Sequence, residues 1–309
     1  LDNTPDLSST LSRPIITGLL REEMKFNGLV FTDAMNMKGV TSKFPTGEAE
    51  LMAVVAGNDL IELSEDVELA ISTIRKALRR GVITWKQVDQ RVKRILAAKE
   101  WAGLDHYEPV DTEGLFTDLN RPETGTLIQR LAEDAVTLLR NNPPNYFPIP
   151  EPLLTTAVVS VGTNYNTVFQ RRIASEKKIS TFILQKDAGA TEIARVEKKL
   201  KQFDRIIVAI HDRRSRPRST LDFSNPVLQF ITHLASQPKS SFAVLANAYT
   251  LEQLQGIENA RVLIACYENS SYTERAAADY FLNKLRPRGK LPVTVNEHFK
   301  AGAGLMIFQ

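Results

Sequence analysis

The sequence predicts an α/β protein, and two observations carry this prediction. Short runs rich in valine, isoleucine, leucine and phenylalanine alternate with amphipathic helical patterns along most of the chain. This order is typical of parallel strands joined by helices. Between residues 141 and 150, four prolines fall within ten positions. Because proline fits neither a helix interior nor a central strand, this stretch is expected to connect two α/β regions.

The first region is expected to contain four helices. Ser12, Ser64 and Thr84 are the expected caps of three of them, the last in a capping-box pattern with Gln87. A further helix is expected over residues 47–56. The expected strands cover residues 29–32 and 59–63. The expected buried faces of the last two helices are Val67, Ala70, Ile71, Ile74 and Leu78, and Val88, Val92, Ile95 and Leu96.

The second region is expected to form an open, mostly parallel sheet with helices on both faces. A helix over 127–139 leads to the connector, and amphipathic helices are expected over 192–203 and 226–234. The expected strands cover residues 157–161, 181–184, 205–210, 242–246, 262–265 and 291–295.

Composition excludes some classes of function. The chain has 309 residues, 43% hydrophobic and 24% charged, with a formal net charge of +3. This weak charge does not indicate nucleic-acid binding, and no apolar run reaches the roughly 20 residues of a membrane span. The first residue is leucine and no leader pattern follows, so we expect a piece of something longer.

Asp33 stands at the end of the first strand, in Gly28-Leu-Val-Phe-Thr-Asp33. In α/β barrels and open sheets the carboxyl ends of parallel strands carry the active site. A carboxylate there serves as nucleophile, general base or metal ligand. An aspartate that only caps the following turn fits the same residues, so both interpretations stay open at this point.

The segment Phe26-Asn-Gly-Leu-Val-Phe-Thr-Asp-Ala-Met-Asn-Met-Lys-Gly-Val40 resembles the nucleophile segment of glycoside hydrolase family 3. Further segments resemble the family in the family's own order, namely residues 19–26, 56–61, 88–99 with Gly103-Leu104, 133–141 and 289–294. The resemblance implies the C-terminal portion of a (β/α)8 barrel, with its last two strands, followed by an α/β sandwich. The implied division is 1–105 for the barrel part, 106–153 for a connector with one helix, and 154–309 for the sandwich.

The resemblance also implies a chemistry. Asp33 matches the nucleophile of a retaining glycosidase, which forms a covalent glycosyl-enzyme. The form Thr-Asp-Ala-Met-x-Met resembles the β-N-acetylglucosaminidase branch, whereas the β-glucosidase branch usually has tryptophan after the nucleophile. Met35 and Met37 are candidate substrate-binding residues, although filling of core gaps is favoured for both. The expected substrate is terminal β-linked N-acetylglucosamine on cell-wall or chitin-type glycans, in an envelope or exported location.

The acid/base residue is expected to be absent from this chain. In the family branch it is a histidine paired with an aspartate upstream of the nucleophile, and no histidine precedes Asp33 here. The chain alone is therefore expected to be inactive, with the missing barrel segment in the same precursor or in another chain. A β-glucosidase or β-xylosidase, or a non-catalytic carbohydrate-binding fragment, is the alternative.

For the other candidate groups, a structural role is favoured over a catalytic one. His211-Asp212 is a tempting acid/base pair, but adjacent strand residues point to opposite faces. Glu268 and Glu274 are possible acids with strand-end and helix-cap alternatives. Cys266 is expected to be a buried, inert thiol.

The remaining motifs favour no ligand. The basic stretch 213–218 is expected to be a solvated loop rather than an anion site, and the glycines of 301–305 and of Gly162-Thr-Asn-Tyr165 lack a phosphate-binding context. No metal-ligand spacing appears, and no cofactor is expected.

Overall fold

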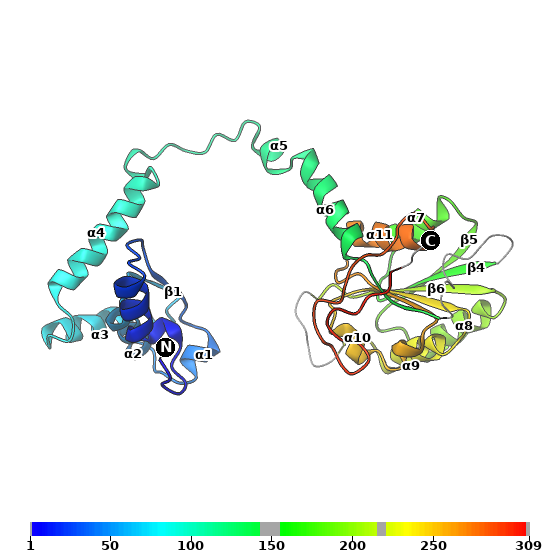
Figure 1. Ribbon diagram of the computed structural model, residues 1–309, viewed down its shortest axis with the longest axis horizontal. Helices are drawn as coiled ribbons and strands as arrows, with labels where there is room; N and C mark the ends of the chain where they lie inside the picture. Colours follow the sequence, from blue (N-terminus) through cyan, green and yellow to red (C-terminus); the bar gives the residue numbers. More distant parts are fainter. Residues whose placement is uncertain (1, 143–154, 215–220, 307–309) are drawn as a thin grey trace. The chain divides into compact units, whose positions relative to one another are not determined.

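The computed structural model describes residues 2–142, 155–214 and 221–306. The chain divides into two compact units, Leu1–Thr112 and Glu113–Gln309, which we call the first and second units (Figure 1). Most of the proline-rich stretch, residues 143–150, lies outside the described residues. No helix in the described parts of the chain has the length and apolar character needed to cross a membrane.

The first unit holds a two-stranded parallel sheet among helices. Strand β1 (Phe31–Ala34) pairs with β2 (Leu60–Glu62), with Phe31 opposite Leu60 and Ala34 opposite Glu62. β1 begins two residues later than expected, so Asp33 lies inside the strand rather than after it. The other elements of this unit are η1 (Ser9–Leu11), η2 (Pro14–Glu23), α1 (Lys38–Thr41), α2 (Glu48–Ala56), α3 (Val67–Arg79), α4 (Trp85–Trp101) and η3 (Leu104–His106).

Two of the expected helix caps are confirmed and one is wrong. Thr84 caps α4 in a capping box with Gln87, and Ser12 Oγ accepts from Ile15 N at the start of η2. Asp66, not Ser64, caps α3 by accepting from Leu69 N at 2.9 Å. The hydroxyl of Ser64 instead donates to Glu50.

The expected buried faces of α3 and α4 are only partly confirmed. Ala70 is buried, and Ile74, Leu78, Val88 and Ile95 are half-buried. Val67, Ile71, Val92 and Leu96 are 45–59% exposed, and α3 buries only its small residues Ala70 and Ala77. The helical period correctly marks an apolar stripe, but the described core of this unit is small. It consists of Leu11, Met35, Val40, Ala49 and Ala53.

The second unit is a six-stranded sheet in the order β3-β8-β7-β6-β4-β5, parallel except for β3. Five of the six expected strands are confirmed. Four of them are buried almost throughout, as strands covered on both faces are, whereas residues 179–184 form an edge strand with exposed side chains. The strands are β3 (Thr137–Asn141), β4 (Thr156–Val161), β5 (Ile179–Leu184), β6 (Arg205–His211), β7 (Ser240–Leu245) and β8 (Val262–Ala265).

Two expectations for this unit are wrong. The helix expected over 127–139 is α6 (Pro122–Ala135), and the next residues form β3, which pairs antiparallel with β8. Residues 291–295 form no strand of the sheet. Their backbone amides bond instead to a nearby loop, with Leu291 N donating to Ala303 O and Val295 N to Phe299 O.

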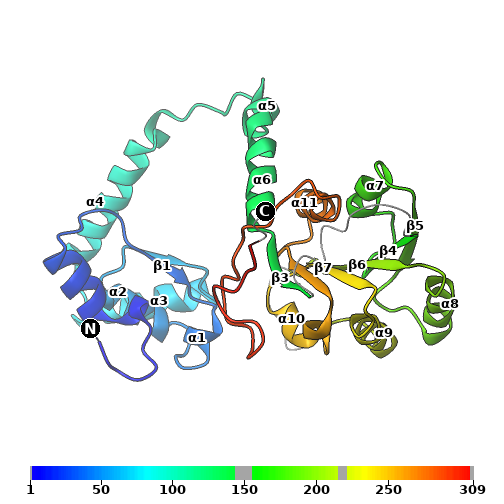
Figure 2. The same cartoon turned by 45° about the vertical axis from the view of Figure 1, so that its right-hand side comes forward.

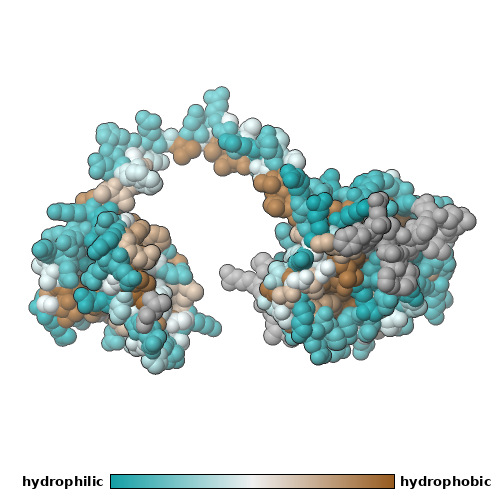
Figure 3. Space-filling model, viewed as in Figure 1, coloured by the Kyte–Doolittle hydropathy of each residue, from teal (hydrophilic) through white to brown (hydrophobic). Residues whose placement is uncertain are grey.

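Helices cover both faces of the sheet (Figures 1 and 2). α7 (Val168–Ala174), α11 (Ser271–Phe281) and α6 pack on one face, and α8 (Ala190–Leu200) and α9 (Asn225–Ala235) pack on the other. The remaining elements are α5 (Leu115–Leu119), α10 (Thr250–Gln253) and η4 (Ile257–Asn259). Brown atoms along α5 and α6 in Figure 3 mark exposed apolar surface. Phe116 of α5, for example, is 80% exposed.

The chain leaves β4 and β6 toward opposite faces of this sheet. β4 lies between β5 and β6, and it is followed by α7 on one face, whereas β6 leads to α9 on the other. Such a topological switch point opens a crevice at the carboxyl ends of the two strands, where ligands bind in open α/β sheets.

Candidate active site

Asp33 presents an exposed carboxylate on β1. Thr32 is 2% exposed and points into the unit, whereas Phe31 and Asp33 alternate with it and are exposed. The register with β2 is irregular between Phe31 and Ala34, and such irregularities re-aim side chains beside active sites. The Oδ1 atom of Asp33 accepts from Ala34 N at 2.8 Å, which fixes one carboxylate oxygen and leaves the other available.

Glu62 is a second exposed carboxylate at the same edge. It ends β2 opposite Ala34, and Leu60, two residues earlier, faces the same side as Phe31. Because Glu62 lies opposite the residue after Asp33 and neighbouring strands are about 4.8 Å apart, both carboxylates lie near the same end of the strand pair. Sequence reasoning did not single out Glu62, although its place at a strand end matches that of Asp33.

A buried aspartate holds the two strands together. Asp59, with a side chain 0% exposed, accepts from Arg21 at 2.5 Å and from Arg94 at 2.9 Å. Its Oδ2 atom also accepts from Val30 N at 2.9 Å, while Asp59 N donates to Val30 O at 2.6 Å. The start of β1 is therefore tied to the start of β2 by side-chain and backbone bonds, and the position of Asp33 depends on them.

A second arginine of α4 braces the same corner. Arg91 donates to Asn58 O at 2.9 Å and to Val54 O at 2.7 Å. Burial lowers the pKa of Arg91 from its ordinary value, with the charge of Asp59 opposing the shift. The segment 88–99 thus positions α2 and β2 through its arginines rather than through an apolar stripe.

The two methionines that follow Asp33 differ in their burial. Met35 is 2% exposed and belongs to the core of the first unit, so its core-filling interpretation is confirmed. Met37 is 51% exposed and precedes α1, so for it that interpretation is wrong. A contact of either methionine with substrate stays a prediction.

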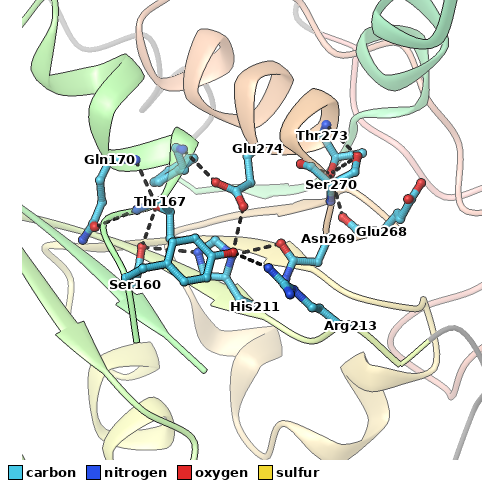
Figure 4. A network of polar contacts seen from close by, with 12 residues as sticks. Ser160, Thr167, Gln170, His211, Arg213, Glu268, Asn269, Ser270, Thr273 and Glu274 are labelled. Atoms are coloured by element: carbon cyan, nitrogen blue, oxygen red, sulfur yellow. Dashed lines mark hydrogen bonds and ion pairs between the residues drawn. The ribbon is translucent and has the colours of Figure 1, made fainter. Parts of the chain in front are cut away.

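His211 does not form an acid/base pair with Asp212. Its ring lies among Ser160, Asn269 and Glu274, at 3.3, 3.2 and 3.8 Å (Figure 4), whereas Asp212 pairs with Arg214. Burial lowers the pKa of His211, and the nearby Glu274 carboxylate opposes that shift. The buried ring thus links the carboxyl end of β6 to β4, to the segment after β8 and to α11.

The other candidate acids and the thiol also have structural roles. Glu274 is 3% exposed and accepts from Phe169 N at 3.0 Å. Glu268 contributes its backbone carbonyl to Thr273 Oγ1 at 2.8 Å. Cys266 is buried as expected, and burial raises the pKa of its thiol to about 12, which disfavours the reactive thiolate.

Of the basic stretch 213–218, residues 215–218 lie outside the described residues. In the described part of this stretch, Arg213 contacts the hydroxyl and ring of Tyr165. Among the residues that the structure describes, no group of three or more histidine, cysteine, aspartate or glutamate side chains is placed to hold a metal ion.

Comparison with known protein families finds a match within the first unit. Residues 1–98 match the glycosyl hydrolase family 3 N terminal domain. The chain is related to this family, and the resemblance that its sequence suggested is confirmed.

Two curated relatives are named as glycosidases. Over 137 residues, 44% of this chain and 24% of the relative, the chain is 29% identical to a β-N-acetylglucosaminidase/β-glucosidase of Cellulomonas fimi. Over 91% of this chain and 41% of the relative, it is 22% identical to a putative β-xylosidase of Formosa agariphila. The chain therefore spans between a quarter and two fifths of the length of these relatives.

Solved structures match across both units and support the fold. A family 3 β-N-acetylglucosaminidase from Paenibacillus sp. str. FPU-7 is 24% identical, with a TM-score of 0.68 over 94% of this chain and 55% of that chain. A β-glucosidase from Listeria innocua is 16% identical, with a TM-score of 0.75 over 94% of this chain and 43% of that chain.

Proposed function

We propose that this chain carries the nucleophile, Asp33, of a retaining glycoside hydrolase that releases terminal β-linked N-acetylglucosamine. The observation that carries the proposal is an exposed carboxylate at the end of a parallel strand pair, within the residues that match the family 3 domain. Asp33 attacks the anomeric carbon and forms a glycosyl-enzyme, and water then hydrolyses that ester.

The local geometry suits this attack. The bond from Ala34 N to Oδ1 restrains the carboxylate, and the strand bonds around Asp59 restrain the backbone. Ala34 carries only a methyl group, which leaves space beside the carboxylate for the sugar ring. Phe31 and Leu60, 58% and 38% exposed on the same face, offer apolar surface next to it.

The proton donor is proposed to come from residues outside these 309, together with the rest of the barrel. Phe31 and Leu60 expose apolar surface on the sheet face, which is typical of a surface that another part of the protein covers. Both strands also have open edges within the described first unit. The acid/base group would lie across the sugar from Asp33.

Substitution of Asp33 in the protein that contains the complete barrel tests the proposal. Asp33→Asn is expected to lower kcat/KM for an aryl β-N-acetylglucosaminide by at least about a thousandfold, because the covalent step has no nucleophile. Asp89→Asn, an exposed site on α4, is the matched control and is expected to retain activity. Full activity of Asp33→Asn would refute the proposal.

A β-glucosidase or β-xylosidase activity is the second candidate. One relative is named for both glucosaminidase and glucosidase activity, and the other is named a putative β-xylosidase. A panel of aryl β-glycosides decides between them: the main proposal requires the highest kcat/KM with the N-acetylglucosaminide. Glycan binding by the chain without turnover in the complete protein would favour a carbohydrate-binding role instead.

A further inference from the structure

A pocket of about 240 Å³ opens in the second unit at the carboxyl ends of its parallel strands. Its lining comes from Gly162–Tyr165 after β4, from Gln185 and Lys186 after β5, from Arg213 after β6, and from Asn269 after β8. β4 and β6 are the strands between which the chain diverges to opposite faces of the sheet. The pocket therefore occupies the place where open α/β sheets bind ligands.

The floor of the pocket is held rigidly. Gly162 has φ +91°, and a Cβ atom there would lie 2.3 Å from His211 O, so the loops after β4 and β6 touch through their backbones. His211 Nδ1 lies 3.2 Å from Asn269 Oδ1, with Ser160 Oγ 3.3 Å from its Nε2 atom (Figure 4). Because Oδ1 of Asn269 is engaged by the ring, its Nδ2 group remains as a donor for a ligand.

One buried hydroxyl in this lining has no partner in the described structure. Thr163 is 8% exposed, and its Oγ1 atom is buried without a hydrogen bond. A buried polar group left without a hydrogen bond costs stability. Because Thr163 lines the pocket, a molecule bound there would supply the missing hydrogen bond.

The charged side chains of the lining are both cationic. Arg213 donates to Tyr165 OH at 2.6 Å and, among the described residues, is paired with no carboxylate. Lys186 pairs with Asp222 at 2.5 Å. The neighbouring Asp212 is engaged by Arg214, and Asp187 adds a further negative charge near Lys186, so Arg213 carries most of the positive charge that a ligand would meet.

We propose that this pocket binds a sugar that carries an oxyanion, either a carboxylate or a phosphate. The Arg213 guanidinium, the Lys186 ammonium, the Thr163 hydroxyl and the Asn269 amide supply donors for the oxyanion. The amides of Gln185 and Asn164 supply both donors and acceptors for sugar hydroxyls. The lining residues all belong to the second unit, and the proposal does not depend on the proposed glycosidase activity.

Calorimetric titration of the 309-residue chain tests the proposal with glucuronate, glucose 6-phosphate, glucose and inorganic phosphate. At least one of the two acidic sugars is expected to bind at least tenfold more tightly than glucose and than inorganic phosphate. Binding of glucuronate alone would assign a carboxylate, and binding of glucose 6-phosphate alone would assign a phosphate. Failure of both to bind at millimolar concentration, or a preference for glucose, would overturn the proposal.

Variants locate the binding and separate it from folding. Arg213→Gln is expected to weaken binding at least tenfold, whereas Arg195→Gln on the exposed face of α8 keeps wild-type affinity. Thr163→Val is expected to weaken binding severalfold without lowering Tm, since it removes a hydroxyl that the fold leaves unbonded. Equal affinity of Arg213→Gln and Arg195→Gln, or an unchanged affinity of Thr163→Val, would show that the pocket is not the site.

Discussion

Replacing Asp59 by asparagine is expected to destabilise the strand pair that carries Asp33 and to leave the second unit unchanged. The buried carboxylate accepts from Arg21 and Val30 N on one oxygen and from Arg94 on the other. Asparagine has one acceptor oxygen, so its amide nitrogen would face a donor. The substitution also removes the only charge that directly compensates Arg21 in the described structure.

The size of the effect follows from the exposure of each partner. The Arg21 side chain is 12% exposed, and breaking such a buried pair by removing one partner costs about 3–5 kcal/mol. Arg94 is 37% exposed, so its pair with Asp59 adds no more than about 1 kcal/mol. An opening free energy lower by about 3 kcal/mol corresponds to a loss of protection of more than about a hundredfold.

Hydrogen exchange measured by mass spectrometry resolves the two units separately. Peptides over β1 and β2 are expected to lose at least a hundredfold of their protection in Asp59→Asn, while peptides over β6 and β7 keep theirs. Asp89→Asn on the exposed face of α4 is the control and is expected to change nothing. Protection of β1 and β2 within threefold of the wild type would refute the reasoning.

Three further substitutions test other parts of the account. His211 has a folded pKa below its unfolded value of about 6.5, so stability falls as pH drops below about 6.5, by up to about 1.4 kcal/mol per pH unit. His211→Gln should reduce the Tm difference between pH 7.5 and 5.5, and an unchanged difference would contradict this. Gly162→Ala should cost more than about 2 kcal/mol in denaturant unfolding, because its φ is positive and its Cβ would overlap a carbonyl; a neutral result would show that the loop relaxes. Thr84→Ala should cost about 1 kcal/mol through loss of the α4 cap, measured as faster exchange in the first turn of α4, and unaltered exchange there would argue against a capping role.

The central strands of the second unit were predictable because burial on both faces demands continuous apolar runs. The stretch from Thr137 to Leu139 was mistaken for helix, since its pattern suits either structure and only pairing with β8 decides it. In the first unit the helical period marked the apolar stripes of α3 and α4, but it could not reveal what covers them. Sequence spacing therefore predicted elements better than it predicted their surroundings.

The candidate site was predictable only in part. A strand end and a family-like segment singled out Asp33, whereas Glu62 and the Asp59–Arg21–Arg94 cluster became apparent from strand register and side-chain contacts. Asp59 is 29 or more positions along the chain from Val30, Arg21 and Arg94, with which it bonds. No local sequence pattern therefore identifies this cluster. The unpartnered hydroxyl of Thr163 is likewise visible only once the crevice has formed.

Covalent trapping identifies the carboxylate that attacks the sugar. The protein containing the complete barrel would be incubated with an activated, fluorinated N-acetylglucosaminyl donor, whose fluorine slows hydrolysis of the glycosyl-enzyme, and then digested and analysed by mass spectrometry. The account predicts one added sugar, located on the carboxylate of Asp33. A label on another carboxylate such as Glu62, or turnover of the donor without any label on Asp33, would contradict it.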